Sequence, residues 1–210
     1  PSLFRDWDDE AIAALPDWYA PTYYDPATRT YPTSIHAYLV RSPDALMLID
    51  AGCGNGKPRP APMDRFGMLD TPFLARLEAA GARAEDLTHV IFTHLHVDHV
   101  GWATVADGDG WRPTFPQALH VMTRVERDAK DPERGARGQS EARTAPFLDS
   151  VKPVLEQGRV QLVEGDEQGF LPGVDFMPTP GHAAGQMAVR LRSDGREALF
   201  AADIMHQPFQ

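Results

Sequence analysis

The residues with the clearest chemistry lie in the short stretch Thr93–His99, which reads Thr-His-Leu-His-Val-Asp-His. It holds three of the chain's eight histidines, together with one carboxylate. Imidazole nitrogens and carboxylate oxygens are the ligands that zinc and other borderline divalent metals prefer in proteins. The stretch therefore predicts a metal site, in preference to a polar loop that is rich in histidine by chance.

A buried strand should position this stretch. The preceding run His89–Phe92 is β-branched and aromatic and ends abruptly in polar residues, which is typical of such a strand. Two more strands are predicted over Ile35–Val40 and Ala45–Ile49. A helix is expected between Thr71, as its N-cap, and Gly81, just past its end. The order strand, strand, helix, strand, motif indicates an α/β fold, with sheets inside and helices outside.

Two later strand ends carry residues of the same types. The predicted strand Val174–Pro178 leads into a Thr-Pro-Gly-His turn that ends at His182, and the strand Ala198–Ala202 leads to Asp203. Alone, each is weak evidence, because such a histidine is commonly a surface residue and such an aspartate is commonly a cap. Beside a histidine cluster both become candidates, since ligands from several strand ends converge at one sheet edge.

The turn after the second predicted strand holds two further residues that could take part in chemistry, Asp50 and Cys53. Asp50 could orient a metal-bound histidine or cap the turn, and both interpretations stay open. The turn lacks the Lys-Ser/Thr ending of a P-loop, which argues against phosphate binding. Cys53 is the single cysteine, so it excludes an internal disulfide. We interpret it as small turn filler rather than as a reactive thiol.

Composition and charge limit the classes of function. A chain of 210 residues with 42% hydrophobic and 24% charged residues is ordinary for one globular domain. We expect a short N-terminal arm over 1–30 and a single domain over 31–210. The net charge of −10 argues against a nucleic-acid partner. The segment Thr123–Arg143 interleaves charges of both signs, so we interpret it as a solvated helix plus loop.

The sequence also bears on location and partners. No apolar run approaches the roughly 20 residues that span a bilayer, and no signal segment opens the chain. We therefore expect no membrane partner. The single cysteine fits a reducing compartment and favours a cytoplasmic location. A removed leader peptide stays open because the chain begins at Pro1, and a homodimer stays open too.

The motifs together resemble the pattern of the metallo-β-lactamase superfamily of hydrolases. They are Thr-His-x-His-x-Asp-His, Thr-Pro-Gly-His and an aspartate after a strand, and the resemblance runs from about Ile35 to the end of the chain. It implies a four-layer αβ/βα sandwich, with two sheets packed face to face, helices on both outsides and the site at one edge. It also implies two divalent metal ions, with zinc the expected metal and iron or manganese as alternatives.

Six residues match the superfamily's ligand positions: His94, His96 and His182 for the first metal, Asp98 and His99 for the second, and Asp203 as the bridging carboxylate. The superfamily normally supplies one more histidine, well downstream of the bridging aspartate. His206 is too close to Asp203 to match that position. Either the chain lacks the C-terminal part of the fold, including its last strand and the seventh ligand, or the second metal site is incomplete, and we favour the first interpretation.

The resemblance implies hydrolysis by a hydroxide that bridges two metals about 3.5–4 Å apart, with no serine or cysteine nucleophile. Asp98 is the expected catalytic residue, because its carboxylate could orient the hydroxide and later help move a proton to the leaving group. The expected substrate is a small lactone or ester with an apolar portion. Six apolar side chains suggest that portion, although each is as readily explained as core: Phe66, Met68, Trp102, Trp111, Met205 and Phe209.

Other activities stay open. The run Val100-Gly101-Trp102 after the motif departs from the Gly-Gly common in glyoxalase II-like thioesterases and looks more like the lactonase and organophosphate-hydrolase branch. Thioester, phosphotriester and β-lactam hydrolysis remain alternatives. An iron-dependent redox enzyme and a non-catalytic metal-binding module are alternatives of another class. Flavodiiron-type sites replace the second motif histidine by glutamate, whereas His96 is present here, so the hydrolase ranks first.

Overall fold

The computed structural model describes residues 8–16, 18–20 and 22–207, and Phe209 lies outside that part of the chain. The chain forms two compact units, one of Ile35–Ala202 and the other of Pro1–Ser34 with Asp203–Gln210. The histidine motif and His182 belong to the larger unit, and Asp203 belongs to the smaller one. The expected division into an arm over 1–30 and a domain over 31–210 stays a prediction.

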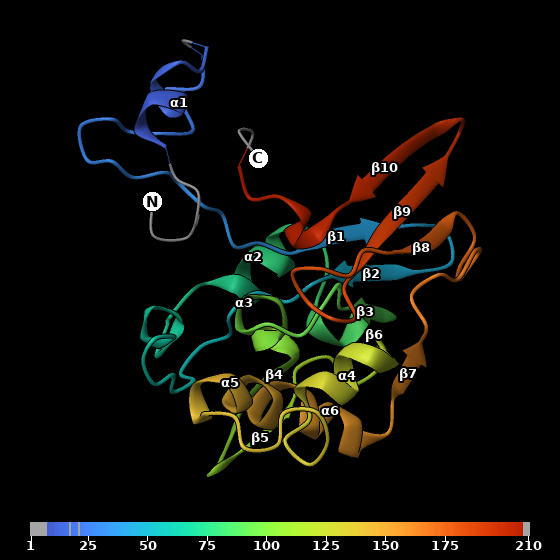
Figure 1. The fold of residues 1–210 in the computed structure, drawn as a ribbon. Helices are drawn as coiled ribbons and strands as arrows, with labels where there is room; N and C mark the ends of the chain where they lie inside the picture. Colours follow the sequence, from blue (N-terminus) through green and yellow to red (C-terminus); the bar gives the residue numbers. More distant parts are fainter. Residues whose placement is uncertain (1–7, 17, 21, 208–210) are drawn as a thin grey trace. The chain divides into compact units, whose positions relative to one another are not determined.

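The larger unit is built on a five-stranded sheet in the order β1-β2-β3-β6-β7 (Figure 1). Its strands are β1 (Tyr38–Arg41), β2 (Leu46–Ile49), β3 (His89–Ile91), β6 (Leu119–Thr123) and β7 (Val160–Val163). β1 and β2 are antiparallel, whereas the other neighbours are parallel. Parallel neighbours require crossover connections, which are usually helical. The carboxyl ends of β2, β3 and β6 therefore meet at one edge of the sheet, where the histidine motif follows β3.

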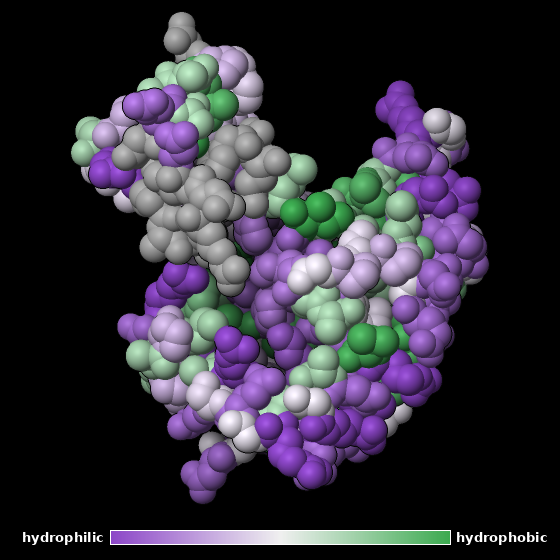
Figure 2. Space-filling view, in the orientation of Figure 1, coloured by the Kyte–Doolittle hydropathy of each residue, from purple (hydrophilic) through white to green (hydrophobic). Residues whose placement is uncertain are grey.

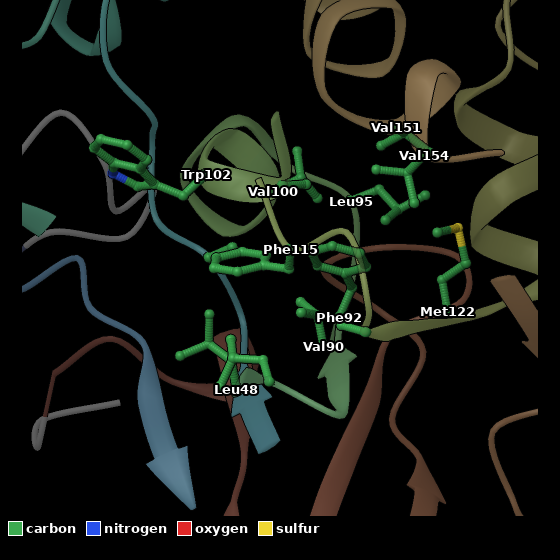
Figure 3. Close-up of a cluster of buried hydrophobic side chains, with 14 of the residues drawn as sticks. Leu48, Val90, Phe92, Leu95, Val100, Trp102, Phe115, Met122, Val151 and Val154 are labelled. Atoms are coloured by element: carbon green, nitrogen blue, oxygen red, sulfur yellow. The ribbon is translucent and has the colours of Figure 1, made fainter. Parts of the chain in front are cut away.

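Helices cover one face of this sheet. They are α2 (Phe73–Ala79), α5 (Glu141–Pro146), the π-helical turn η4 (Phe147–Val151) and α6 (Lys152–Gln157). Apolar side chains of the helices, the strands and the segment after β3 pack in one core. This core includes Phe92 and Leu95, which follow β3, and Val154 of α6 (Figure 3). Full burial of a side chain of this size contributes about 1.5–3 kcal/mol. Leu148 stands three residues before the buried Val151, the spacing of one helix face, but it is 46% exposed because the π turn breaks the 3.6-residue spacing.

The other face of the five-stranded sheet packs on a three-stranded antiparallel sheet in the order β10-β9-β8. Its strands are β8 (Val174–Pro178), β9 (Met187–Ser193) and β10 (Arg196–Phe200). The register partners Ile49, Ile91 and Val121 contribute to the core between the sheets. Leu199, on the edge strand β10 of this second sheet, is exposed. The predicted α/β sandwich is confirmed, with two sheets packed face to face and helices on the outer face of the five-stranded sheet.

Short elements connect these layers. They are α3 (Val97–Val100), α4 (Arg124–Lys130), the hairpin of β4 (Thr104–Asp107) and β5 (Gly110–Pro113), and 3-10 turns over Asp64–Phe66, Ala84–Asp86, Gly101–Ala103 and Ala202–Ile204. Thr71 does not cap α2 as expected: the N-cap position is Pro72, and the Thr71 backbone N–H and hydroxyl both donate to Asn55 Oδ1. Among the described residues, helices are too short or too polar to cross a membrane.

A buried polar cluster joins the loop after β2 to the helical layer. Lys57 and Arg59 are both buried, and both pair with the Asp149 carboxylate on η4. The Lys57 ammonium also donates to Thr104 Oγ1 at 2.7 Å and lies 3.6 Å from the centre of the Trp111 ring. Burial lowers the pKa of Lys57 to about 8, against the opposing attraction of Asp149. This cluster ties the loop to the helical layer and places the Trp111 ring against the Lys57 ammonium.

The smaller unit begins with α1 (Asp9–Ala13), whose N-terminus is capped by the Asp8 carboxylate. Trp18, Tyr19 and Tyr23 form an aromatic cluster after this helix. Gln207 Nε2 donates to the Pro32 carbonyl at 2.9 Å, which ties the two chain segments of the unit together. On the face drawn in Figure 2, hydrophilic side chains predominate and apolar ones form separate patches, in keeping with the acidic composition.

Candidate metal centre

The motif segment lies directly on the turn that follows β2. Ala51 N donates to His99 O at 2.7 Å, and Gly101 N donates to Gly52 O at 2.6 Å. A Cβ atom at Gly101 would lie only 1.8 Å from the backbone carbon of Cys53, so no other residue fits there without moving the chain. The glycine-rich turn therefore serves as the backbone platform of α3, which carries Asp98 and His99.

Asp50 occupies the centre of this platform and orients the motif. Its Oδ1 accepts from the Thr93 backbone N–H at 2.8 Å, and its Oδ2 lies 2.9 Å from His99 Nδ1. A carboxylate on one ring nitrogen fixes the orientation of a histidine and leaves the other nitrogen for a metal. Of the two interpretations left open by the sequence, these contacts favour Asp50 as the group that orients a histidine.

The Thr93 hydroxyl extends this network to His94. It donates to the Asp50 carboxylate, with oxygens at 2.8 and 3.0 Å, and lies 3.2 Å from His94 Nδ1. Because its proton goes to Asp50, the hydroxyl can accept a proton from Nδ1 of His94. That tautomer leaves His94 Nε2 with its lone pair, on the side of the ring that faces His96.

Three predicted ligands of the first metal converge. His94 Nε2 lies 3.0 Å from His96 Nδ1, which lies 2.8 Å from His182 Nε2. Ligand atoms of all three residues lie within 4.8 Å of one another. Three nitrogens bound tetrahedrally to zinc at 2.0–2.1 Å lie about 3.3 Å apart, so the cluster needs only a small expansion to hold the ion. His94 is buried and His182 is exposed, so the cluster is accessible from one side.

The two residues predicted for a second metal lie beside this cluster. The His99 ring centre is 4.0 Å from that of His94, and His99 Nε2 is 4.0 Å from Asp98 Oδ1. Since Asp50 engages Nδ1, Nε2 is the nitrogen that His99 can offer to a metal. The larger unit thus brings five of the six predicted ligands into one neighbourhood.

Asp203 begins the second chain segment of the smaller unit, so its bridging role stays a prediction. Within that unit its Oδ2 lies 3.2 Å from His206 Nε2. Trp102, suggested for an apolar pocket, is buried and stacks on Phe73 with ring centres 5.0 Å apart. Cys53 is buried as well, and burial, reinforced by the charge of Asp98, raises the pKa of its thiol to about 12. The thiol is therefore protonated at neutral pH and suits turn filler.

One residue near the site was misjudged from the sequence. Glu126 was expected in a solvated segment but is only 1% exposed and bonds to the motif loop. The spacing of Thr123 and Glu126 is that of a capping box, which signals a helix start. Thr123 does cap α4. That signal could have located the helix, but it carries no information on burial.

Comparisons with known proteins identify one family for this chain. Residues 30–210 match the sequence profile described as the metallo-β-lactamase superfamily. A probable metallo-hydrolase of Mycobacterium tuberculosis is 29% identical over 200 residues, covering 81% of this chain and 56% of that protein. An N-acyl homoserine lactonase of Bacillus cereus is 27% identical over 118 residues, covering 56% of this chain and 38% of that protein. The chain thus spans about half the length of the curated relatives it matches, or less.

Solved structures agree with the fold. A hydrolase described as belonging to the β-lactamase superfamily, AbOPH, superposes with a TM-score of 0.75 at 26% identity, covering 98% of this chain and 67% of that one. A dizinc quorum-quenching lactonase, AidC, superposes with a TM-score of 0.61 at 22% identity, covering 81% of this chain and 56% of that one. At that identity the second likeness shows the fold alone.

Proposed function

Since the chain belongs to the metallo-β-lactamase superfamily, we propose that it is a metal-dependent hydrolase that cleaves a small lactone or ester with an apolar portion. The observation that carries the proposal is the convergence of His94, His96 and His182 from two distant segments. Three imidazoles with an accessible side are the ligand set of a catalytic rather than a structural zinc site, which keeps a position open. The lactone class is supported by the lactonase relative, and no longer by Trp102 or Trp111.

The donor set determines which residues would hold metal. His94, His96 and His182 would hold one divalent ion, and Asp98 and His99 would serve a second, with Asp203 proposed as the bridge. Zinc is the proposed metal because it accepts both imidazole and carboxylate, although iron and manganese remain alternatives. A bound ion of this kind supplies a water of lowered pKa and a Lewis acid for the substrate carbonyl.

The chain's own residues would orient the metal ligands and transfer the proton. Asp50 and Thr93 hold the rings of His99 and His94, so that the ligand nitrogens are fixed before any ion or substrate arrives. Asp98 is partly exposed beside His99, where its carboxylate can accept a proton from the attacking water and return it to the leaving alcohol. In a lactone that alcohol stays attached, and the product is a hydroxy acid.

The proposal includes a small-molecule substrate and no nucleic acid, which the net charge of −10 supports. A cytoplasmic location is proposed from the single cysteine, which fits a reducing compartment. A homodimer remains an open alternative to a monomer.

A substrate panel on metal-loaded protein tests the proposal. The panel contains lactones, aryl esters, phosphotriesters, β-lactams and thioesters, and elemental analysis accompanies it. We expect lactones or esters to be hydrolysed fastest, with activity abolished in His96→Ala and retained in His89→Gln, a histidine at the other end of β3. Stoichiometric iron with oxygen uptake and no hydrolysis would refute the hydrolase assignment.

A further inference from the structure

The three histidines of the proposed first metal come from two separate segments. His94 and His96 follow β3, whereas His182 lies in the turn after β8. A functional constellation must hold its geometry to about 0.5 Å, so something must fix one segment against the other. One tie is a backbone bond from Met187 N to Thr93 O at 2.9 Å. The other tie is a side chain from outside both segments.

That side chain is Glu126, in the first turn of α4, and it is buried. Its two carboxylate oxygens go to different segments. Oε2 accepts from Gly185 N at 2.9 Å, and Oε1 lies 3.4 Å from Leu95 N. Leu95 stands between His94 and His96, and Gly185 stands three residues after His182. One carboxylate therefore bonds to the backbone of both ligand-bearing loops.

The start of α4 is shaped for this contact. Thr123 Oγ1 accepts from Glu126 N at 3.1 Å and donates to Gly185 O at 2.7 Å. A Cβ atom at position 185 would lie 2.3 Å from Thr123 Oγ1 and 2.4 Å from Glu126 N. The loop after His182 therefore approaches the helix start as bare backbone. Both the N–H and the C=O of Gly185 are engaged there.

A helix-capping role alone does not explain this arrangement. An acidic side chain near a helix N-terminus is favourable when exposed, with no need for burial. A buried carboxylate is costly unless its oxygens are bonded. Its cationic neighbour, Lys130 Nζ, is 3.7 Å from Oε1, too far for a short charged hydrogen bond. The two loop N–H groups and the Lys130 ammonium together compensate the burial of this carboxylate, and only the loop N–H groups join it to the ligand-bearing segments.

We propose that Glu126 is a positioning residue of the metal centre, holding the His94–His96 loop against the His182 loop. The inference rests on the proposed metal site. It assigns to Glu126 no contact with metal or substrate. Its consequence is that loss of the carboxylate loosens the three-histidine cluster and weakens metal binding more than the accompanying loss of stability explains.

The test compares zinc affinity across variants of the full chain, by competition with a chromophoric chelator. We expect Glu126→Ala to bind zinc about 10–100-fold more weakly, the usual effect of losing a group that supports metal ligands. Glu126→Gln should lose less, because its amide oxygen still accepts from one loop. Glu126→Gln is also the variant that tests the proposal if Glu126→Ala does not fold. Val174→Ala, a buried core change at the far end of β8, should lower the melting temperature yet keep zinc affinity within a factor of about two.

Cobalt(II) spectra provide a second readout, since ligand-field bands report the geometry of the site. Altered bands in Glu126→Gln, with unaltered bands in Val174→Ala, support the proposal. Unchanged zinc affinity in folded Glu126→Ala, or in folded Glu126→Gln if the alanine variant does not fold, overturns it. So does an equal loss of affinity in Val174→Ala. If the wild-type chain itself binds no zinc, the proposed function is overturned as well. If the wild type binds zinc and the folded Glu126 variants bind it equally well, only the role of Glu126 is overturned.

Discussion

Replacement of Asp50 by asparagine tests the histidine network most sharply. In the native site His99 Nδ1 lies 2.9 Å from Asp50 Oδ2, so a proton on Nδ1 is donated to the carboxylate. Asparagine can keep an oxygen toward Thr93, but its NH₂ group then faces His99. The ring must accept at Nδ1 and carry its proton on Nε2 instead, which removes the nitrogen available to a metal.

The magnitude follows from what the carboxylate of Asp50 contributes. Loss of a group that orients a metal ligand costs 10–100-fold in affinity, or about 1.4–2.7 kcal/mol. Hydrogen bonds to a charged group contribute about 1.5–3 kcal/mol each, and one of them is replaced here. We therefore expect Asp50→Asn to lower stability by about 1.5–3 kcal/mol and to weaken the second metal selectively. The first metal, on His94, His96 and His182, should persist.

Zinc content at buffered free zinc measures this outcome. The free zinc concentration is set between the dissociation constants of the second site in the wild type and in the variant. There the wild type should hold two ions per chain and Asp50→Asn about one. Asp175→Asn is the matched control, because Asp175 is also a buried aspartate, and it accepts from Gly169 N and pairs with Arg190. Two tightly bound ions in Asp50→Asn, or an equal loss in the control, would refute the reasoning.

Three further predictions follow from buried polar groups. Asp149→Ala leaves Lys57 and Arg59 buried without their carboxylate and should cost about 3–5 kcal/mol in urea unfolding, whereas an effect below about 1 kcal/mol would contradict the pairing. Burial lowers the pKa of His120 to about 4, so the unfolded chain binds the proton more readily and stability should fall as pH drops from about 6.5 to 4. His120→Leu should remove that part of the pH dependence, and an unchanged profile would argue against it. The Cys53 thiol, with its pKa raised to about 12, should react with a thiol reagent only after unfolding, and rapid labelling of the native protein would contradict its burial.

The parts of the fold that were predicted depend on local patterns. The run His89–Phe92 predicted β3 because a buried strand is continuous in β-branched and aromatic residues. The ligands of the histidine motif lie within six residues, so their chemistry is visible in the sequence. His182 became a candidate only beside that motif, and the structure brings its Nε2 to 2.8 Å from His96.

What the sequence did not predict depends on contacts between distant residues. Glu126 stands among charged neighbours, and only the approach of two loops buries it. Asp50 was left between two roles, because its distance to His99 spans 49 positions in the chain. Leu148 has the spacing of a buried residue, but a π turn rotates it outward. Trp102 looked like a pocket residue and instead stacks on Phe73 in the core.

Anomalous diffraction at the zinc edge from crystals of the zinc-loaded protein tests the central claim most directly. We predict a peak about 2.0–2.1 Å from each of three nitrogens, His94 Nε2, His96 Nδ1 and His182 Nε2. Absence of a peak among these three rings, or ordered zinc held elsewhere in the larger unit, would contradict the assignment of the metal centre.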